Sequence, residues 1–124
     1  MTAEARDPTL RVTMLPRDTN ARGTIFGGVI LSHIDLAGAV AASRQSVRNF
    51  VTRAMREVEF IAPVYVGDVV SFYTAVVREG KTSITIHVLV EAERFSEPGK
   101  TFRVTEADVV YVAVAENGKA IPIR

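Results

Sequence analysis

Cysteine and tryptophan are absent from the 124 residues, and only two histidines are present, His33 and His87. Without cysteine, the chain has no disulfide, no thiol nucleophile and no thiolate metal ligand. Two histidines without H-x-x-x-H spacing do not predict a metal site. The sequence also lacks G-x-G-x-x-G, a phosphate-binding P-loop and G-x-S-x-G. These absences exclude the common dinucleotide-binding and serine-hydrolase signatures.

An excess of charge of one sign is also missing. The 15 Lys and Arg residues nearly balance the 14 Asp and Glu residues, and the formal net charge is +1. There is no run of basic residues, so neither nucleic acid nor a membrane surface is an expected partner. The first eight residues, MTAEARDP, carry no apolar signal core, which favours a cytoplasmic protein. A length of 124 residues fits a single domain over 1–124, with enough chain for a hydrophobic core.

One helix is expected to begin near the Gly27-Gly28 pair and to end near Ser43. Apolar residues surround it: Val29, Ile30, Leu31, Ile34, Leu36, Ala37, Ala39, Val40, Ala41 and Ala42. A helix without a continuous polar face belongs inside a protein. It is too short and too interrupted by polar residues to cross a membrane.

Asp35 is the exception within this helix. A buried carboxylate costs several kcal/mol unless it is paired, hydrogen-bonded or protonated. Asp35 is therefore either a catalytic carboxylate or a structural one paired with an arginine. Before the helix, DTNARG predicts a tight turn, in which Asn20 is ordinarily a turn former. The Gly27-Gly28 pair either permits close packing or lets a ligand reach the N–H groups of the helix start.

The spacing of these features constrains how they can act together. Gly28 and Asp35 are seven residues apart, so roughly 10 Å of helix rise separates them. One reacting carbonyl must lie about 3 Å from both kinds of group. If both take part in one reaction, they come from two copies of the helix. Two antiparallel helices related by a dimer axis would create two equivalent sites.

The rest of the chain predicts strands at residues 9–14, 51–60, 69–78, 82–95 and 101–115, joined by short turns. Strict alternation is clearest in 82–95, where Ile84, Ile86, Val88 and Val90 share one face. Residues 54–60 are also compatible with a helical turn. The pattern predicts an α+β fold, with a curved antiparallel sheet wrapped around one central helix.

The motif DTN-x-x-G-x-I-F-G-G-x-I-L-S, followed by HID-x-x-G-A, resembles the hot-dog-fold acyl-CoA thioesterases of the YciA type. The resemblance continues through VTRAMREVEFIAPVYVGDVVSFY, the G-K-T-S turn and TEADVVYVAV, and it covers nearly the whole chain. It implies hydrolysis of acyl-CoA to free acid and CoA. It also implies a homodimer with continuous sheets as the minimal unit, and assembly into hexamers.

The resemblance also implies roles for individual residues. Asp35 would be the general base or the nucleophile, and Asn20 would orient the water or the thioester. Gly28, with Gly27, would supply the N–H contact to the oxyanion from the partner chain. CoA is part of the substrate and product, so no separate cofactor is implied.

For substrate binding, the resemblance points to the Gly80-Lys81-Thr82-Ser83 turn for the pantetheine and nucleotide of CoA. Phe60 and Pro63 would line the channel, and Arg94 is a further candidate. The CoA phosphates need cations near an open groove, and the other basic side chains available are Arg53, Arg56, Arg78 and Arg103. Exposed strand faces also carry such side chains without binding a ligand.

Two alternative functions stay open. The first is a dehydratase or hydratase of acyl thioesters on the same fold, which needs a histidine beside the carboxylate. His33 is two residues from Asp35 and is expected on another helix face, so it is interpreted as structural, as is His87. The second alternative is a CoA-binding module without turnover, since fold alone does not establish activity.

Overall fold

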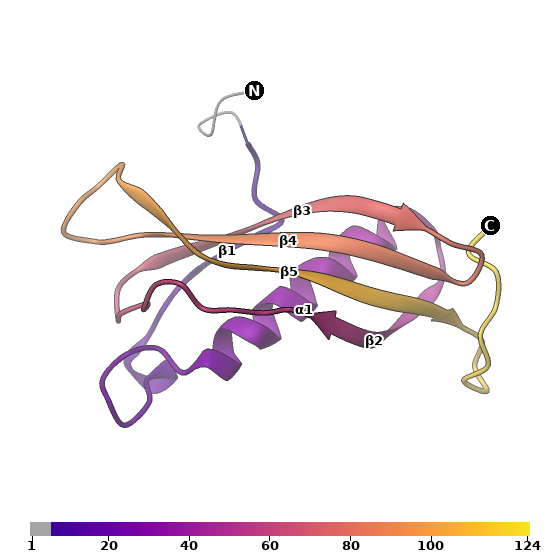
Figure 1. Cartoon of the computed structure of the whole chain (residues 1–124), viewed down its shortest axis with the longest axis horizontal. Helices are drawn as coiled ribbons and strands as arrows, with labels where there is room; N and C mark the ends of the chain where they lie inside the picture. The colour runs from indigo at the N-terminus through magenta and orange to yellow at the C-terminus, as the bar shows by residue number, and fades with distance from the viewer. Residues whose placement is uncertain (1–5) are drawn as a thin grey trace.

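The computed structural model describes residues 6–124 and consists of one helix packed against one antiparallel sheet (Figure 1). The expected N-terminal lead-in falls largely in residues 1–5, outside the described residues. The elements are β1 Leu10–Thr13, a short 3-10 turn η2 Pro16–Asp18, α1 Gly27–Ser43, β2 Asn49–Arg56, β3 Val69–Glu79, β4 Ser83–Glu93 and β5 Thr101–Val114. The spatial order of the five strands is β1-β3-β4-β5-β2. The predicted α+β architecture is confirmed.

Strand β4 lies at the centre of the sheet, and buried and partly exposed residues alternate along it without interruption. Its even-numbered residues from Ile84 to Ala92 are buried against α1, and its odd-numbered residues face outward. Strands β3 and β5 pair along its two sides. The sheet therefore has an inner face against the helix and an outer face away from it.

Helix α1 is buried on one side only in the single chain. Ile30, Ile34 and Ala37 have less than 2% exposure, whereas the Leu36 side chain is 54% exposed. The expectation of a helix buried all round is therefore wrong for the isolated chain. The sheet covers one face of the helix and leaves the other open. No helix within residues 6–124 has the length and apolarity needed to cross a membrane.

Strand β2 differs most from its predicted bounds. It begins at Asn49, inside the expected polar connection, and ends at Arg56 rather than at residue 60. Glu57 has φ of 50°, a left-handed conformation that interrupts a strand. The chain still follows β5 afterwards, because the Ile61 N–H donates to the Val104 carbonyl at 2.9 Å.

The sheet has two edges, β1 and β2. β2 pairs only with β5 in the described chain, so its other side carries unpaired backbone groups. Natural proteins protect such edges or use them for pairing. The β2 edge lies beside the part of α1 that carries Asp35, since the Thr52 side chain of β2 contacts that carboxylate.

Candidate active site

Asp35 lies on α1 at the boundary between the covered and open helix faces. The Thr52 hydroxyl of β2 donates to its Oδ1 at 2.6 Å. The side chain is only partly buried in the single chain, so the expectation of a buried carboxylate is wrong at this level of assembly. Within residues 6–124 it forms no ion pair with an arginine, and its second carboxylate oxygen, Oδ2, remains available to a ligand.

A hydrogen bond from the sheet also holds the backbone of Asp35. The Tyr111 hydroxyl of β5 donates to the Asp35 carbonyl at 2.6 Å. A Cβ atom on Gly38 would collide with this hydroxyl, so glycine is what lets the tyrosine reach the helix. Burial, followed by the nearby Asp35 charge, raises the pKa of Tyr111 well above its usual value of about 10. Tyr111 is therefore a permanent donor at neutral pH.

An open groove of about 360 Å³ runs along this face of α1. It is lined by Ser32, His33, Asp35, Leu36, Ala39 and Thr52. His33 thus lines the same groove as Asp35, although its position predicted a separate face. Its ring lies against Phe72, with the centroids 5.7 Å apart, and its Nδ1 is 2.8 Å from the Val29 carbonyl. These contacts give His33 a structural role.

Asn20 lies in the predicted turn before the helix. Its Oδ1 accepts from the backbone N–H groups of Arg22 at 2.8 Å and Thr24 at 3.3 Å. Its Nδ2 donates to the Thr24 hydroxyl at 2.9 Å. The side chain therefore fixes the turn, and its second amide hydrogen is left for another acceptor.

The start of α1 offers unpaired donors. Its N-cap residue, Phe26, makes no side-chain capping bond. The first N–H groups of a helix have no acceptor within the helix and carry partial positive charge. Gly27 and Gly28 occupy this first turn, and no Cβ covers their N–H groups. In one chain these groups lie on the same helix as Asp35, about 10 Å away along its axis; a single chain does not bring them together.

Phe60 and Pro63 form a second pocket at the start of the helix. Its volume is about 330 Å³, and Gly27, Ile30 and Val64 are among the other residues that line it. The Phe60 ring lies 3.5 Å from where a Gly27 Cβ would be. The structure therefore brings both predicted channel residues to the predicted oxyanion site.

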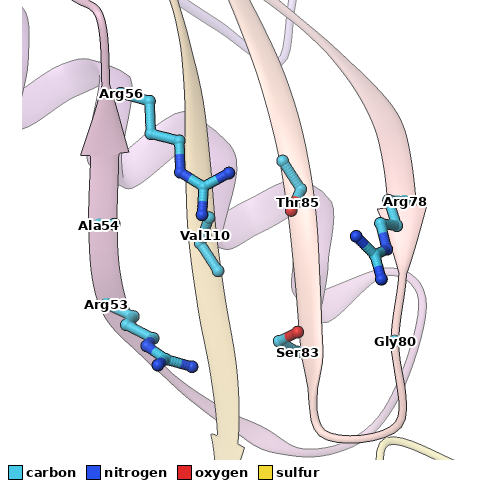
Figure 2. Close-up of a pocket in the computed structure, with 8 residues that line it drawn as sticks. All are labelled: Arg53, Ala54, Arg56, Arg78, Gly80, Ser83, Thr85 and Val110. Carbon is cyan, nitrogen blue, oxygen red and sulfur yellow. The ribbon is translucent and has the colours of Figure 1, made fainter.

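The Gly80-Lys81-Thr82-Ser83 turn joins β3 to β4. The Gly80 N–H donates to the Ser83 carbonyl at 2.7 Å, which closes the turn. Gly80 and Ser83 line a third pocket, of about 250 Å³, together with Arg53, Arg56 and Arg78 (Figure 2). Lys81 and Thr82 belong to the turn but not to the wall of this pocket.

Arg94 is occupied within the chain. Its guanidinium makes two bonds of 3.3 Å to Asp68, which is 1% exposed, and lies over the rings of Tyr65 and Phe102. The bond to Asp68 is the main cause that raises the pKa of Arg94. These contacts give Arg94 a structural role that does not require a substrate. Its predicted role in substrate binding stays a prediction.

Comparison with known proteins identifies the family. The family model of the thioesterase superfamily matches residues 22–96. The chain is 42% identical over 116 residues to the acyl-CoA thioester hydrolase YciA of Salmonella typhimurium, covering 92% of this chain and 87% of the relative. It is 41% identical over 122 residues to YciA of Escherichia coli, covering 95% and 92%. The chain belongs to the thioesterase superfamily.

Solved structures of related thioesterases agree with this assignment. A hexameric hotdog fold thioesterase of Campylobacter jejuni superimposes with a TM-score of 0.88 at 46% identity, covering 94% of this chain and 90% of that one. A hexameric thioesterase of Yersinia pestis gives 0.89 at 38% identity, covering 97% of both chains. The fold of this thioesterase-superfamily chain is the hot-dog fold.

Sequence reasoning missed the two residues that hold Asp35, Thr52 and Tyr111. Both lie in segments that carried the resemblance, but as single polar residues in strands they had no distinguishing signal. They face each other across β2 and β5. To connect them with the helix, one would have needed the pairing register of β2 and β5, whose paired residues lie more than fifty positions apart in the sequence.

Proposed function

We propose that this protein is an acyl-CoA thioesterase, which hydrolyses acyl-CoA to a free carboxylic acid and CoA. The observation that carries the proposal is the Asp35 carboxylate, held by Thr52 in an open groove on a helix that begins with Gly27-Gly28. Membership of the thioesterase superfamily and similarity to acyl-CoA thioester hydrolases support it.

The chemistry needs an activated nucleophile and donors for the charge that develops on the carbonyl oxygen. Asp35 either takes a proton from the attacking water, or attacks the carbonyl carbon itself to form a mixed anhydride that water then hydrolyses to the free acid. The N–H groups at Gly27 and Gly28 stabilise the oxyanion. The C–S bond then breaks, and because a thiolate leaves readily, no strong general acid is required. The second amide hydrogen of Asn20 is placed to orient the water or the thioester.

Two chains are needed to bring these groups together. The open face of α1 and the unpaired edge of β2 lie side by side, and both are suited to a second copy of the chain. A two-fold axis between antiparallel helices would place the helix start of one chain near Asp35 of the other. We infer a homodimer as the minimal active unit, in a hexamer like those of the related thioesterases, acting in the cytoplasm without a bound metal or cofactor.

A dehydratase or hydratase is the second candidate, because His33 shares the groove with Asp35. The ring is engaged by Val29 and Phe72, which favours the hydrolase. Loss of turnover in His33→Ala as complete as in Asp35→Asn would favour the dehydratase. A non-catalytic CoA-binding module would bind CoA but would not turn over any acyl-CoA.

The test is release of free thiol from a panel of short to long acyl-CoAs by the wild type and by Asp35→Asn. The substitution keeps the shape of the side chain and its bond with Thr52, but removes the negative charge. We expect turnover by the wild type and its loss by a factor of about 10² to 10⁴ in the variant. Full activity in the variant would make Asp35 structural.

A further inference from the structure

The segment between β2 and β3 is irregular where it passes the start of α1. β2 ends at Arg56, and β3 begins at Val69. Within this segment, Phe60 lines the pocket at the helix start, and its ring lies 3.5 Å from where a Gly27 Cβ would be. Phe60 is 43% exposed, so burial alone does not fix the position of its ring. The backbone of the segment has to hold the ring at the helix start.

Two consecutive residues of β5 hold the backbone on both sides of Phe60. The Thr105 hydroxyl donates to the Glu59 carbonyl at 2.7 Å. The Ile61 N–H donates to the Val104 carbonyl at 2.9 Å. The peptide group before Phe60 and the peptide group after it are thus both bonded to one strand. Because each peptide group is planar, these two bonds together determine the direction of the Phe60 Cα–Cβ bond.

The far end of the same segment is bonded to the residues that precede the helix. The Ile25 N–H donates to the Val64 carbonyl at 2.8 Å, and both residues are buried. Ile25 comes directly before Phe26, the N-cap residue of α1. The segment therefore connects β5 with the helix start, and Phe60 lies between its two points of attachment.

Thr105 is a buried polar residue, with 1% exposure. Its neighbour Val104 is also buried, although successive residues of a regular strand face opposite sides. A β-bulge accounts for this, because the register of β4 with β5 shifts between Val90 and Glu91 and leaves Val104 as the extra residue. Bulges redirect side chains and are often found beside functional sites. A buried hydroxyl needs a hydrogen-bond partner, and that of Thr105 bonds the Glu59 carbonyl, outside the regular strands.

We propose that Thr105 is a positioning residue of the thioesterase reaction. Its hydroxyl fixes the backbone before Phe60, and the Phe60 ring limits how the thioester can lie at the N–H groups of Gly27 and Gly28. These donors stabilise the oxyanion only from about 3 Å, and a displacement of about 1 Å can lower the rate by about 10²-fold. Thr105 is buried and acts through the ring, without touching the substrate. This inference rests on the proposed function.

The test is a double-mutant cycle between Thr105 and Phe60. Thr105→Val removes the hydroxyl but keeps the branched shape, and we expect kcat/KM for acyl-CoA to fall about five- to tenfold, the effect of losing one hydrogen bond. Thr105→Ser keeps the hydroxyl and should recover most of the activity. In the Phe60→Ala background, Thr105→Val should cause no further loss, because the ring is already absent. A loss by the same factor in both backgrounds would overturn the inference.

Thr74→Val is the matched control. It removes another hydroxyl bond of the same sheet, the one of 2.5 Å between Thr74 of β3 and Thr9. Urea unfolding should show a similar loss of stability in Thr74→Val and Thr105→Val. Under conditions in which both variants are folded, kcat/KM should stay unchanged in Thr74→Val and fall in Thr105→Val. An equal fall in the two variants would contradict the inference, by showing that any loosening of the sheet lowers activity.

A fluorescent reporter follows the ring at this position without reference to turnover. The chain contains no tryptophan, so Phe60→Trp introduces a single one. We expect the anisotropy of its fluorescence to fall when Thr105→Val is added and to stay unchanged when Thr74→Val is added. Unchanged anisotropy with Thr105→Val would show that the hydroxyl does not hold the ring. Hydroxyl-dependent anisotropy in a protein whose wild type hydrolyses no acyl-CoA would remove the proposed function and keep Thr105 as the residue that holds Phe60.

Discussion

Thr52 and Tyr111 face each other across β2 and β5, and both donate a hydrogen bond to Asp35. Thr52 holds the carboxylate, and Tyr111 holds the backbone carbonyl of the same residue. One cross-strand pair therefore fixes both the position of the helix and the direction of its acid. Catalytic groups act efficiently only when neighbouring bonds and packing hold them in place.

The Thr52 bond can be tested by exchanging its hydroxyl. Thr52→Val keeps the shape of the side chain but removes the donor, so the carboxylate loses its fixed orientation. We expect kcat to fall about tenfold, the effect of losing about 1.4 kcal/mol, with little change in KM. Thr52→Ser restores the hydroxyl and should recover most of the activity. Equal loss in both variants would show that the methyl packing matters rather than the bond.

The raised pKa of Tyr111 leads to a prediction about the stability of the fold at high pH. Its pKa is raised in the folded protein, so the unfolded chain loses this proton first as the pH rises. The contribution of the Tyr111 hydroxyl to the free energy of unfolding is complete below about pH 10 and is lost progressively above that value. The free energy of unfolding should therefore fall more steeply above pH 10 for the wild type than for Tyr111→Phe, by up to about 1.4 kcal/mol per pH unit. Denaturant titrations from pH 9 to 11.5 measure this, and parallel curves would mean that Tyr111 ionises freely in the fold.

The fold was predictable because its signals are local and periodic. The alternation in residues 82–95 and the apolar run of the helix each determine an element without reference to the rest of the chain. Their packing follows, since one helix and a curved sheet must cover each other. The end of β2 was not predictable, because Glu57 has φ of 50°. This left-handed conformation is usually indicated by a glycine or an asparagine, and neither occurs at this position.

The candidate site was only partly predictable for a related reason. Gly28, Asn20 and Asp35 lie within sixteen residues of chain, and a local motif revealed them. The contact of Thr52 with the helix depends on the pairing register of the strands. The pocket lined by Arg53, Arg56 and Arg78 depends in addition on two β-bulges, in β2 and β3, which place residues distant in sequence on one face of the sheet. The exposure of Leu36 could not be foreseen, because it reflects the face of α1 that this chain alone does not cover.

Two of the three glycines in α1, Gly28 and Gly38, are predicted to have different roles. Alanine at Gly38 would collide with the buried Tyr111 ring and hydroxyl, so Gly38→Ala should destabilise the fold by about 1–3 kcal/mol. Alanine at Gly28 meets only the ring of Phe26, which is 57% exposed and free to turn. Gly28→Ala should therefore keep the stability and lose activity by blocking the thioester. Thermal unfolding and thiol release separate the two effects, and an active, stable Gly28→Ala would exclude close approach at this position.

Arg94 should matter first for stability. Arg94→Gln leaves the Asp68 carboxylate buried without its ion partner, which we expect to destabilise the protein by about 3 kcal/mol. Urea unfolding measures this loss. The KM for acyl-CoA, measured under conditions in which the variant is folded, tests the binding role. A rise larger than that in Arg11→Gln, which removes an arginine from strand β1 of the same sheet, supports binding. An unchanged KM leaves Arg94 purely structural.

The most direct test of the account is complementation between two inactive variants. Asp35→Asn removes the acid, and Asn20→Asp keeps the turn-forming acceptor while placing a charge at the partner side of the site. In a mixed dimer, one of the two sites receives both defects and the other receives neither. After the two variants are unfolded and refolded together in equal amounts, the account predicts recovery of about a quarter of the wild-type thioesterase activity. Activity no greater than that of the separately refolded variants would contradict a site shared between two chains.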